Sequence, residues 1–164
     1  MFATLAPILL QATLETFAMV ISALALGTAF GLPLGVLLAT SGRGELFEAP
    51  LFQKSIGPIV NATRSVPFII LAVAIIPFTR LIVGTSIGTS AAIVPLTVAA
   101  IPFIARIIEG AIRDVDGGLV EAAQAMGARP FQVVTKVLLP EALPGIIHGL
   151  TLTAVPPIGY SPLF

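Results

Sequence analysis

Cysteine and tryptophan are absent from the 164-residue sequence, histidine occurs once, and only 10% of the residues are charged. Without cysteine the chain has no disulfides and no thiolate metal sites, and a single histidine excludes the usual histidine-rich metal sites. Eight basic residues balance eight acidic ones, so the sequence lacks the basic clusters of nucleic-acid-binding proteins. We therefore expect no bound metal, no cofactor and no nucleic-acid partner.

Hydrophobic residues are abundant instead, at 57% of the chain, and the mean hydropathy is +1.08. A soluble domain is usually about 25% charged, and one soluble core could not bury this much apolar surface. The composition predicts a protein that crosses the membrane several times. Because the apolar runs have the length of helical spans, we expect an all-α membrane protein.

Four segments are candidates for membrane spans. Residues 16–42 carry no charge, and as a helix they would extend about 40 Å, more than a hydrocarbon core of about 30 Å. The uncharged stretch 65–79 would extend only about 22 Å, so the second span must include residues upstream of it. We expect spans at about 16–40, 57–79, 88–106 and 141–160, with a long cytoplasmic loop at about 107–140.

Three glycines, Gly27, Gly31 and Gly35, lie four residues apart inside the first of these spans. This spacing would let another helix approach closely, since membrane helices associate through small residues. Glycine is also simply common in membrane spans. The sequence alone leaves both explanations open.

Polar residues are drawn into the membrane by the second span, where Arg64 lies about two turns deep. An ionisable residue inside the membrane points to a functional site, but an arginine near a helix end can also extend its charge to the headgroups. We favour the second explanation for Arg64. Asn61, Arg64 and Ser65 are candidates for a translocation path or for a structural polar role.

Basic residues indicate the orientation of the chain. Residues 43–64 and 106–136 hold seven of the eight Lys and Arg residues, and the turn at 80–90 holds only Arg80. The positive-inside rule therefore places both long connections in the cytoplasm and the N-terminus outside. Within the second connection, Glu109 and Arg113 lie four residues apart, in the order that favours an ion pair on a helix.

Residues 118–141 are predicted to form two short amphipathic helices separated at Gly127. Glycine can adopt the positive φ that commonly ends a helix, and Pro130 suits the first turn of the next helix. Pro140 is expected to end that second helix. Apolar side chains recur at helical spacing on both helices: Leu119, Ala122, Ala123 and Met126 on the first, and Phe131, Val134 and Leu138 on the second.

The same segment carries a motif at fixed spacing: Glu121-Ala122-Ala123, three residues, Gly127, nine residues, the aliphatic Val137, one residue, then Leu139-Pro140. This motif resembles the cytoplasmic coupling loop of ABC-importer permeases. The alternative is a hairpin lying on the bilayer surface, which does not require the glycine spacing. Within the importers, the chain is similar to the permeases of bacterial methionine-uptake systems, through residues 64–70, 76–80, 83–88, 92–97, 102–106 and 136–145.

The resemblance implies an importer-type transmembrane helix bundle, one permease domain over residues 1–164, in the bacterial inner membrane. Such a permease has no enzymatic activity of its own. It would assemble in the lipid bilayer with a second permease copy, with cytoplasmic ATP-binding subunits and with a lipid-anchored substrate-binding protein, and would import methionine or a related amino acid. The resemblance assigns ATPase coupling to Glu121, Ala122, Ala123, Met126, Gly127, Leu139 and Pro140.

The likeness to the family weakens after about residue 153. The adjacent Pro156 and Pro157 remove two backbone donors. We therefore expect the fourth span to be broken and the family's fifth span to be missing. This leaves an alternative function open, that of a truncated, non-transporting membrane fragment that still binds the ATPase or a permease partner.

Overall fold

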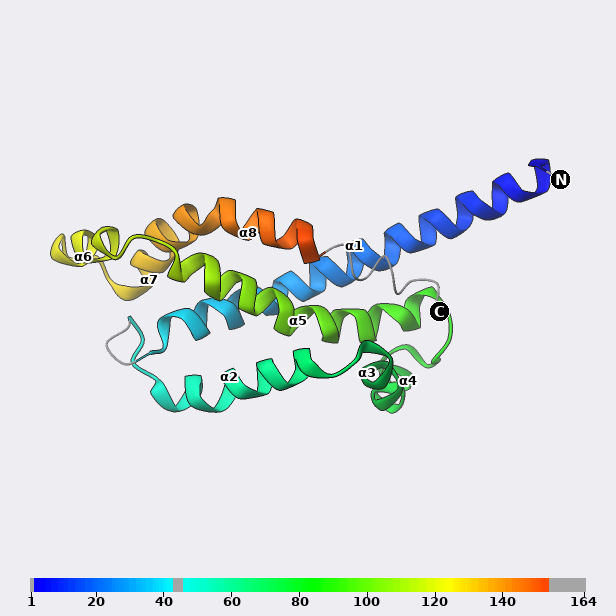
Figure 1. Ribbon diagram of the computed structural model, residues 1–164, viewed down its shortest axis with the longest axis horizontal. Helices are drawn as coiled ribbons and strands as arrows, with labels where there is room; N and C mark the ends of the chain where they lie inside the picture. Colours follow the sequence, from blue (N-terminus) through cyan, green and yellow to red (C-terminus); the bar gives the residue numbers. More distant parts are fainter. Residues whose placement is uncertain (1, 43–45, 154–164) are drawn as a thin grey trace.

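The structure, a computed structural model, describes residues 2–42 and 46–153, and these residues form helices and no strand. The elements are α1 (Phe2–Thr40), α2 (Pro50–Ser65), α3 (Phe68–Ala74), α4 (Ile76–Val83), α5 (Thr89–Arg113), α6 (Gly117–Ala125), α7 (Pro130–Val133), a π-helical segment (Val134–Leu138) and α8 (Leu139–Thr153). The predicted all-α class is confirmed (Figure 1).

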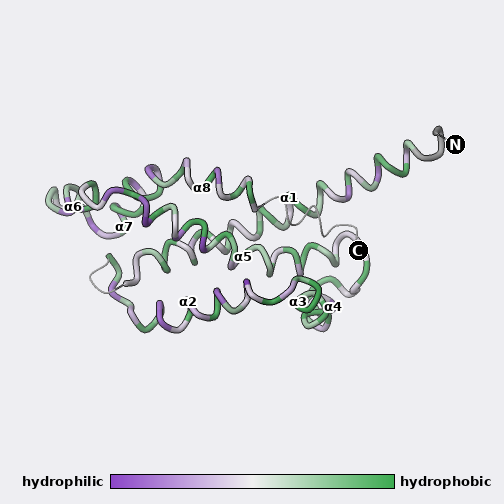
Figure 2. The backbone as a smooth tube through the Cα atoms, in the orientation of Figure 1, coloured by the Kyte–Doolittle hydropathy of each residue, from purple (hydrophilic) through white to green (hydrophobic). Residues whose placement is uncertain are grey.

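Helix α5 lies at the centre of the bundle, with contacts to α1, to α8 and to α2, α3 and α4 (Figure 1). The N-terminal part of α1 extends past one end of α5, and α6 and α7 lie at the other end. Hydrophilic residues gather towards the end that carries α6 and α7 (Figure 2). Three helical stretches are long and apolar enough to span a membrane: Ala6–Thr40, Thr89–Arg113 and Pro130–Thr153. The bent pair α2–α3 would make a fourth span.

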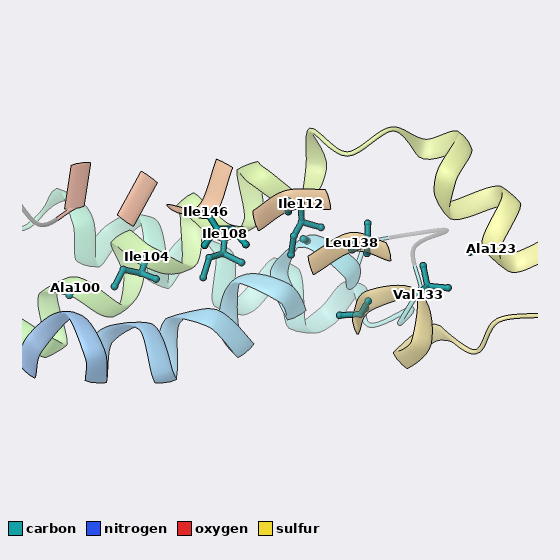
Figure 3. Packing of buried hydrophobic residues seen from close by; sticks show 11 residues of the cluster. Ala100, Ile104, Ile108, Ile112, Ala123, Val133, Leu138 and Ile146 are labelled. Atoms are coloured by element: carbon teal, nitrogen blue, oxygen red, sulfur yellow. The ribbon is translucent and has the colours of Figure 1, made fainter. Parts of the chain in front are cut away.

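The largest core cluster follows one face of α5 and continues beneath the hairpin of α6 and α7. Ile104 and Ile108, one helical turn apart, are both fully buried, as expected of the inward face of a packed helix. Figure 3 shows how the π-helical segment, α8 and the hairpin add side chains to this face. The labelled members are Ala100, Ile104, Ile108, Ile112, Ala123, Val133, Leu138 and Ile146.

The glycines of α1 allow this helix to approach α5 closely. A Cβ atom added at Gly31 would lie 2.9 Å from Ile104, and one at Gly35 would lie 2.5 Å from the Ala105 carbonyl oxygen. Gly27 faces α5 at a similar distance. Of the two explanations for this spacing, close helix packing is therefore the one that the structure supports, and the partner is a helix of the same chain.

Helix α8 approaches α5 in the same manner on another side. A Cβ at Gly145 would lie 3.2 Å from Ala111, and one at Gly149 would overlap the Ile107 side chain. Helix α5 is therefore packed between two glycine-bearing helices. Close packing of this kind is the main source of helix association where water is absent.

The second predicted span, residues 57–79, is not one straight helix. Helices α2 and α3 meet at an angle of 108°, because Val66 takes an extended conformation with ψ of 128°. Pro67, which follows it, disfavours the helical region for the residue before it. Helix α4 then contains Arg80, so the predicted turn at 80–90 begins later than expected.

Two other helices are longer than the spans predicted for them. Helix α1 begins at Phe2 rather than near residue 16, and α5 continues to Arg113 rather than ending near 106. The flanking residues are rich in Ala, Leu and Ile, and these do not interrupt a helix. The fourth predicted span is described only as far as residue 153, so the predicted double-proline break lies outside the described residues.

The prediction that Pro140 ends the second helix of the hairpin is wrong. The helical chain is continuous from Pro130 to Thr153. It passes Pro140 through the π-helical segment, in which the Leu139 N–H donates to the Val134 carbonyl oxygen. A regular α-helix would place the proline ring against the carbonyl four residues earlier, and the wider π-turn relieves that contact.

Candidate coupling site

The turn between α6 and α7 is built by its own backbone. Gly127 has φ of +82°, its N–H donates to the Gln124 carbonyl at 2.9 Å, and the Ala128 N–H donates to the Ala123 carbonyl at 3.0 Å. These two bonds form a Schellman motif, which satisfies carbonyls left over at the end of a helix. The predicted role of Gly127 as the helix-ending residue with positive φ is confirmed.

Capping interactions fix both helices of the hairpin. Asp116 accepts a hydrogen bond from the Gly118 N–H at 2.8 Å at the start of α6. At the start of α7, the Gln132 side chain accepts from the Arg129 N–H at 2.9 Å, and Pro130 occupies the first turn as predicted. Each cap satisfies a backbone donor that the first turn leaves without a partner. The hairpin therefore holds its shape through local bonds.

The predicted coupling residues divide into exposed and buried groups. Glu121, Ala122 and Pro140 are exposed, and Met126 is 83% exposed. Ala123 is only 5% exposed and belongs to the core cluster. Its methyl group therefore supports the hairpin from beneath instead of facing outward with Met126. Leu139 is half-buried where the π-helical segment joins α8.

Sequence reasoning also missed one exposed aromatic residue. Phe131 is grouped by spacing with Val134 and Leu138, but these two are buried whereas Phe131 is 71% exposed. The difference arises because Phe131 lies in the first turn after the loop, before the helix reaches the core. The sequence signal for the exposure of Phe131 was its position just after the Gly127 turn. Met126 and Phe131 give the hairpin an apolar outer surface.

A buried carboxylate anchors the base of the hairpin. Glu109, 6% exposed, accepts a hydrogen bond from Arg106 and forms an ion pair with Arg113 at 3.0 Å. Sequence reasoning predicted the pair with Arg113 and overlooked Arg106, although its spacing of three residues from Glu109 also favours an ion pair on a helix. A buried carboxylate requires such partners, because an unpaired charge in the interior is strongly unfavourable.

The two arginines extend this anchor to neighbouring helices. Arg106 Nη2 donates to the Gly57 carbonyl of α2 at 2.7 Å, and Arg113 Nη2 donates to the Leu38 carbonyl near the end of α1 at 3.4 Å. We call Arg106, Glu109 and Arg113 the Glu109 clamp. It joins three helices at the point where α5 leads into α6.

The three polar candidates of the second span do not form one site. Asn61 lines an open hollow of about 450 Å³, and the three residues of the Glu109 clamp form part of the same wall. The Arg64 guanidinium lies over the Phe103 ring, 4.7 Å from its centroid, in a different pocket. The Ser65 hydroxyl donates to the Asn61 carbonyl at 3.1 Å, within its own helix. Across the described residues, no group of three or more His, Asp or Glu side chains is placed to hold a metal ion.

Comparison with known proteins identifies the family. Residues 31–163 match the family described as "Binding-protein-dependent transport system inner membrane component". The chain belongs to this family. The predicted resemblance to importer permeases is thereby confirmed, and the chain is a membrane component of a binding-protein-dependent transporter rather than its ATPase.

Relatives in this family include proteins of methionine transport. The chain is 56% identical to the "Probable D-methionine transport system permease protein MetI" of Vibrio cholerae, over 98% of this chain and 71% of that protein. It is 51% identical to the "D-methionine transport system permease protein MetI" of Escherichia coli K12, over 94% of this chain and 71% of that protein. The chain therefore corresponds to about 71% of the length of each.

Solved structures give the same fold. One chain of the inward-facing MetNI methionine ABC transporter matches with a TM-score of 0.93 and 50% identity, over 96% of this chain and 73% of that one. A chain of an amino acid ABC transporter with histidines matches with a TM-score of 0.76 over 99% of this chain and 72% of that one. At 19% identity, the second match shows a shared fold alone.

Proposed function

We propose that this family member is the permease subunit of an ATP-driven importer for methionine or a related amino acid. The observation that carries the proposal is the 56% identity to a D-methionine permease over 98% of the chain. The exposed hairpin at one end of the bundle supports it, because a permease needs a surface through which a separate ATPase can act on the spans. ATP hydrolysis would take place in that partner subunit.

The hairpin transmits motion from the ATP-binding subunit to the spans. Glu121, Ala122 and Met126, with Phe131 beside them, are accessible to a groove on the partner. Gly127 fixes the angle between the two helices. Because the chain is helical from Pro130 through Leu139-Pro140 into α8, a displacement of the hairpin would move α8 as a rigid element.

The Glu109 clamp would transmit a displacement of the hairpin to further helices. It lies on the last turns of α5, immediately before α6, and holds the C-terminal end of α1 and the middle of α2 through their carbonyl groups. A movement of the hairpin would therefore act on α5, α1 and α2 together. Packed helices that move as units are a common form of transporter motion.

The assembly that we propose follows the family. Two permease copies form the transmembrane unit, each hairpin engages one cytoplasmic ATP-binding subunit, and a lipid-anchored binding protein delivers the amino acid from the other side. In this arrangement the N-terminus lies outside and the hairpin in the cytoplasm, as the distribution of Lys and Arg favours.

Uptake by reconstituted transporter tests this proposal. The permease, its ATP-binding subunit and its binding protein would be placed in vesicles, and ATP-dependent accumulation of labelled methionine measured. We expect accumulation that requires all three proteins. Co-purification of the permease with the ATP-binding subunit, without any uptake, would instead support the alternative of a non-transporting membrane subunit.

A further inference from the structure

A pocket of about 210 Å³ lies at the bend between α2 and α3. The last turn of α2, the first turns of α3, the middle of α5 and the end of α8 all contribute to its wall. Most of the wall is apolar, including Phe68, Leu71 and Phe103, and one charged side chain, Arg64, enters it. The pocket therefore combines a single cation with an aromatic and aliphatic lining.

The polar groups of this wall are not equivalent. The hydroxyl groups of Thr63 and Thr153 donate to carbonyls of their own helices, at 2.9 Å in each case. Arg64 makes no ion pair within the described part of the chain, and its guanidinium lies over the Phe103 ring. A guanidinium stacked on a ring face keeps its in-plane N–H donors available for a planar anion.

The pocket lies close to the charged end of α5. Phe103 is fourteen residues after Thr89 and three before Arg106, which corresponds to about 21 Å and about 5 Å along the helix. The exposed Arg64 lies over the Phe103 ring and so at the same level. An ionisable residue inside a membrane-spanning segment points to a functional site.

The bend between α2 and α3 also indicates a functional site. Broken backbone at membrane depth is tolerated where it is buried in protein or lines a cavity, and interrupted helices commonly form the substrate sites of transporters. Here the break at Val66 and Pro67 directly follows Arg64. The irregular backbone, the Arg64 cation and the cavity therefore occur at one place.

We propose that this pocket binds a small apolar amino acid in transit, with Arg64 holding the α-carboxylate through paired N–H donors. Phe68, Leu71 and Phe103 would contact the apolar side chain. The volume is below the roughly 300–1,000 Å³ of pockets for drug-sized ligands, which limits the ligand to about one amino acid. The proposal rests on the proposed function and adds a site and a recognition group to it.

Arg64→Gln separates this role from assembly. In vesicles containing the full permease with its ATP-binding subunit and binding protein, we expect ATP-dependent methionine uptake to fall at least about tenfold, because the variant loses a charged hydrogen-bond partner. Arg64→Lys keeps the charge but not the paired geometry, so its uptake should lie between the two. Arg80→Gln, outside the pocket on α4, is the matched control and should leave uptake unchanged.

The absence of cysteine from the sequence allows a direct test of occupancy. Ala99 lines the pocket, and in an Ala99→Cys permease we expect methionine, but not the alcohol methioninol, to slow alkylation of the thiol. Ile87→Cys, at a 79% exposed position outside the pocket, should show no protection. Adding Arg64→Gln to Ala99→Cys should abolish the protection.

The outcomes distinguish this proposal from the function on which it rests. If the unaltered transporter imports methionine and Arg64→Gln imports it equally well, the pocket proposal is wrong and the importer function stands. The same conclusion follows if methioninol protects the thiol of the Ala99→Cys variant as well as methionine does. If the unaltered transporter imports no methionine, the proposed function fails first. If Arg64→Gln does not assemble with its partners, Arg64→Lys takes its place. Reduced uptake by Arg64→Lys at normal basal ATP hydrolysis would support the proposal, and normal uptake would contradict it.

Discussion

The contact between α1 and α5 and the turn of the coupling hairpin both depend on glycine, but for different physical reasons. A Cβ added at Gly35 would meet the Ala105 carbonyl oxygen at 2.5 Å, whereas at Gly127 nothing lies within 4 Å. Gly127 is required by its φ of +82°, which side chains disfavour. The bundle is therefore held by close approach of helices, and the hairpin by its own backbone conformation.

Apolar side chains show the same contrast. Ile108 in the bundle is completely buried, whereas Met126 and Phe131 on the hairpin are 83% and 71% exposed. Inside a membrane, apolar contact adds little driving force and packing determines association. Outside it, an exposed apolar surface of this kind marks a binding partner. Substitutions in the bundle should therefore change stability, and substitutions on the hairpin should change coupling.

Gly35→Leu should have the largest effect. The added side chain meets a backbone carbonyl that cannot rotate away, so α1 and α5 must separate, at a cost of about 3 kcal/mol or more. We expect the yield of monodisperse permease on size-exclusion chromatography to collapse. Gly110→Leu on α5 is the matched control, because an added Cβ there meets nothing within 4 Å. Equal yields for both variants would contradict the importance of this close approach.

Glu109→Gln should have the next largest effect. The substitution leaves Arg106 and Arg113 without their counter-charge, which we expect to destabilise the permease by about 2 kcal/mol, less than for a fully buried pair because Arg113 is half exposed. The measurement is the midpoint of thermal unfolding of the purified complex. Glu121→Gln removes a charge from the exposed hairpin and should change that midpoint little. A similar midpoint for both variants would exclude a structural role for the clamp.

Gly127→Val should have a smaller, local effect on stability and a specific effect on coupling. A β-branched residue at positive φ costs about 1–2 kcal/mol, and it alters the angle between α6 and α7. We expect insertion and basal ATP hydrolysis to persist while methionine uptake falls. Gly127→Asn, which tolerates the left-handed conformation better, should retain uptake. Normal import by Gly127→Val would show that the turn geometry is not needed.

The local features of the hairpin could be predicted from the sequence, because they depend on neighbouring residues. Gly127 at positive φ and Pro130 in the first turn follow from intrinsic backbone preferences. The continuation of the helix through Pro140 could not be predicted in this way, because a π-turn absorbs the proline ring and no local preference demands one. The 108° bend after α2 was likewise missed, although Pro67 supplied a signal for it.

The other features that the sequence did not predict depend on contacts between residues far apart in the chain. Helical spacing placed Ala123 beside Met126 and Phe131 beside Val134, but which side of a short helix faces the core depends on how the hairpin folds back on α5. Arg106 and Glu109 lie three residues apart on α5, but the bond from Arg106 to the Gly57 carbonyl joins residues 49 positions apart. The glycine spacing in α1 indicated close packing without identifying α5 as the partner. Such facts require the tertiary structure.

Met126→Ser should have the smallest effect on stability and a clear effect on partner binding. The side chain is 83% exposed, so its loss should change the stability of the permease by less than about 0.5 kcal/mol. If Met126 inserts into a groove of the ATP-binding subunit, the substitution should weaken binding of that subunit roughly fivefold or more, as expected for a central interface residue.

Leu81→Ser provides the control for this last variant, because Leu81 is 86% exposed but lies on α4, at the end of the bundle away from the hairpin. Affinity of the purified permease for the ATP-binding subunit would be measured for both variants alongside thermal midpoints. Unchanged affinity for Met126→Ser would remove this residue from the coupling surface and leave Phe131 as its apolar member. A large loss of stability would show instead that the hairpin, like the bundle, depends on contacts within the chain, and the contrast between the two regions would fail.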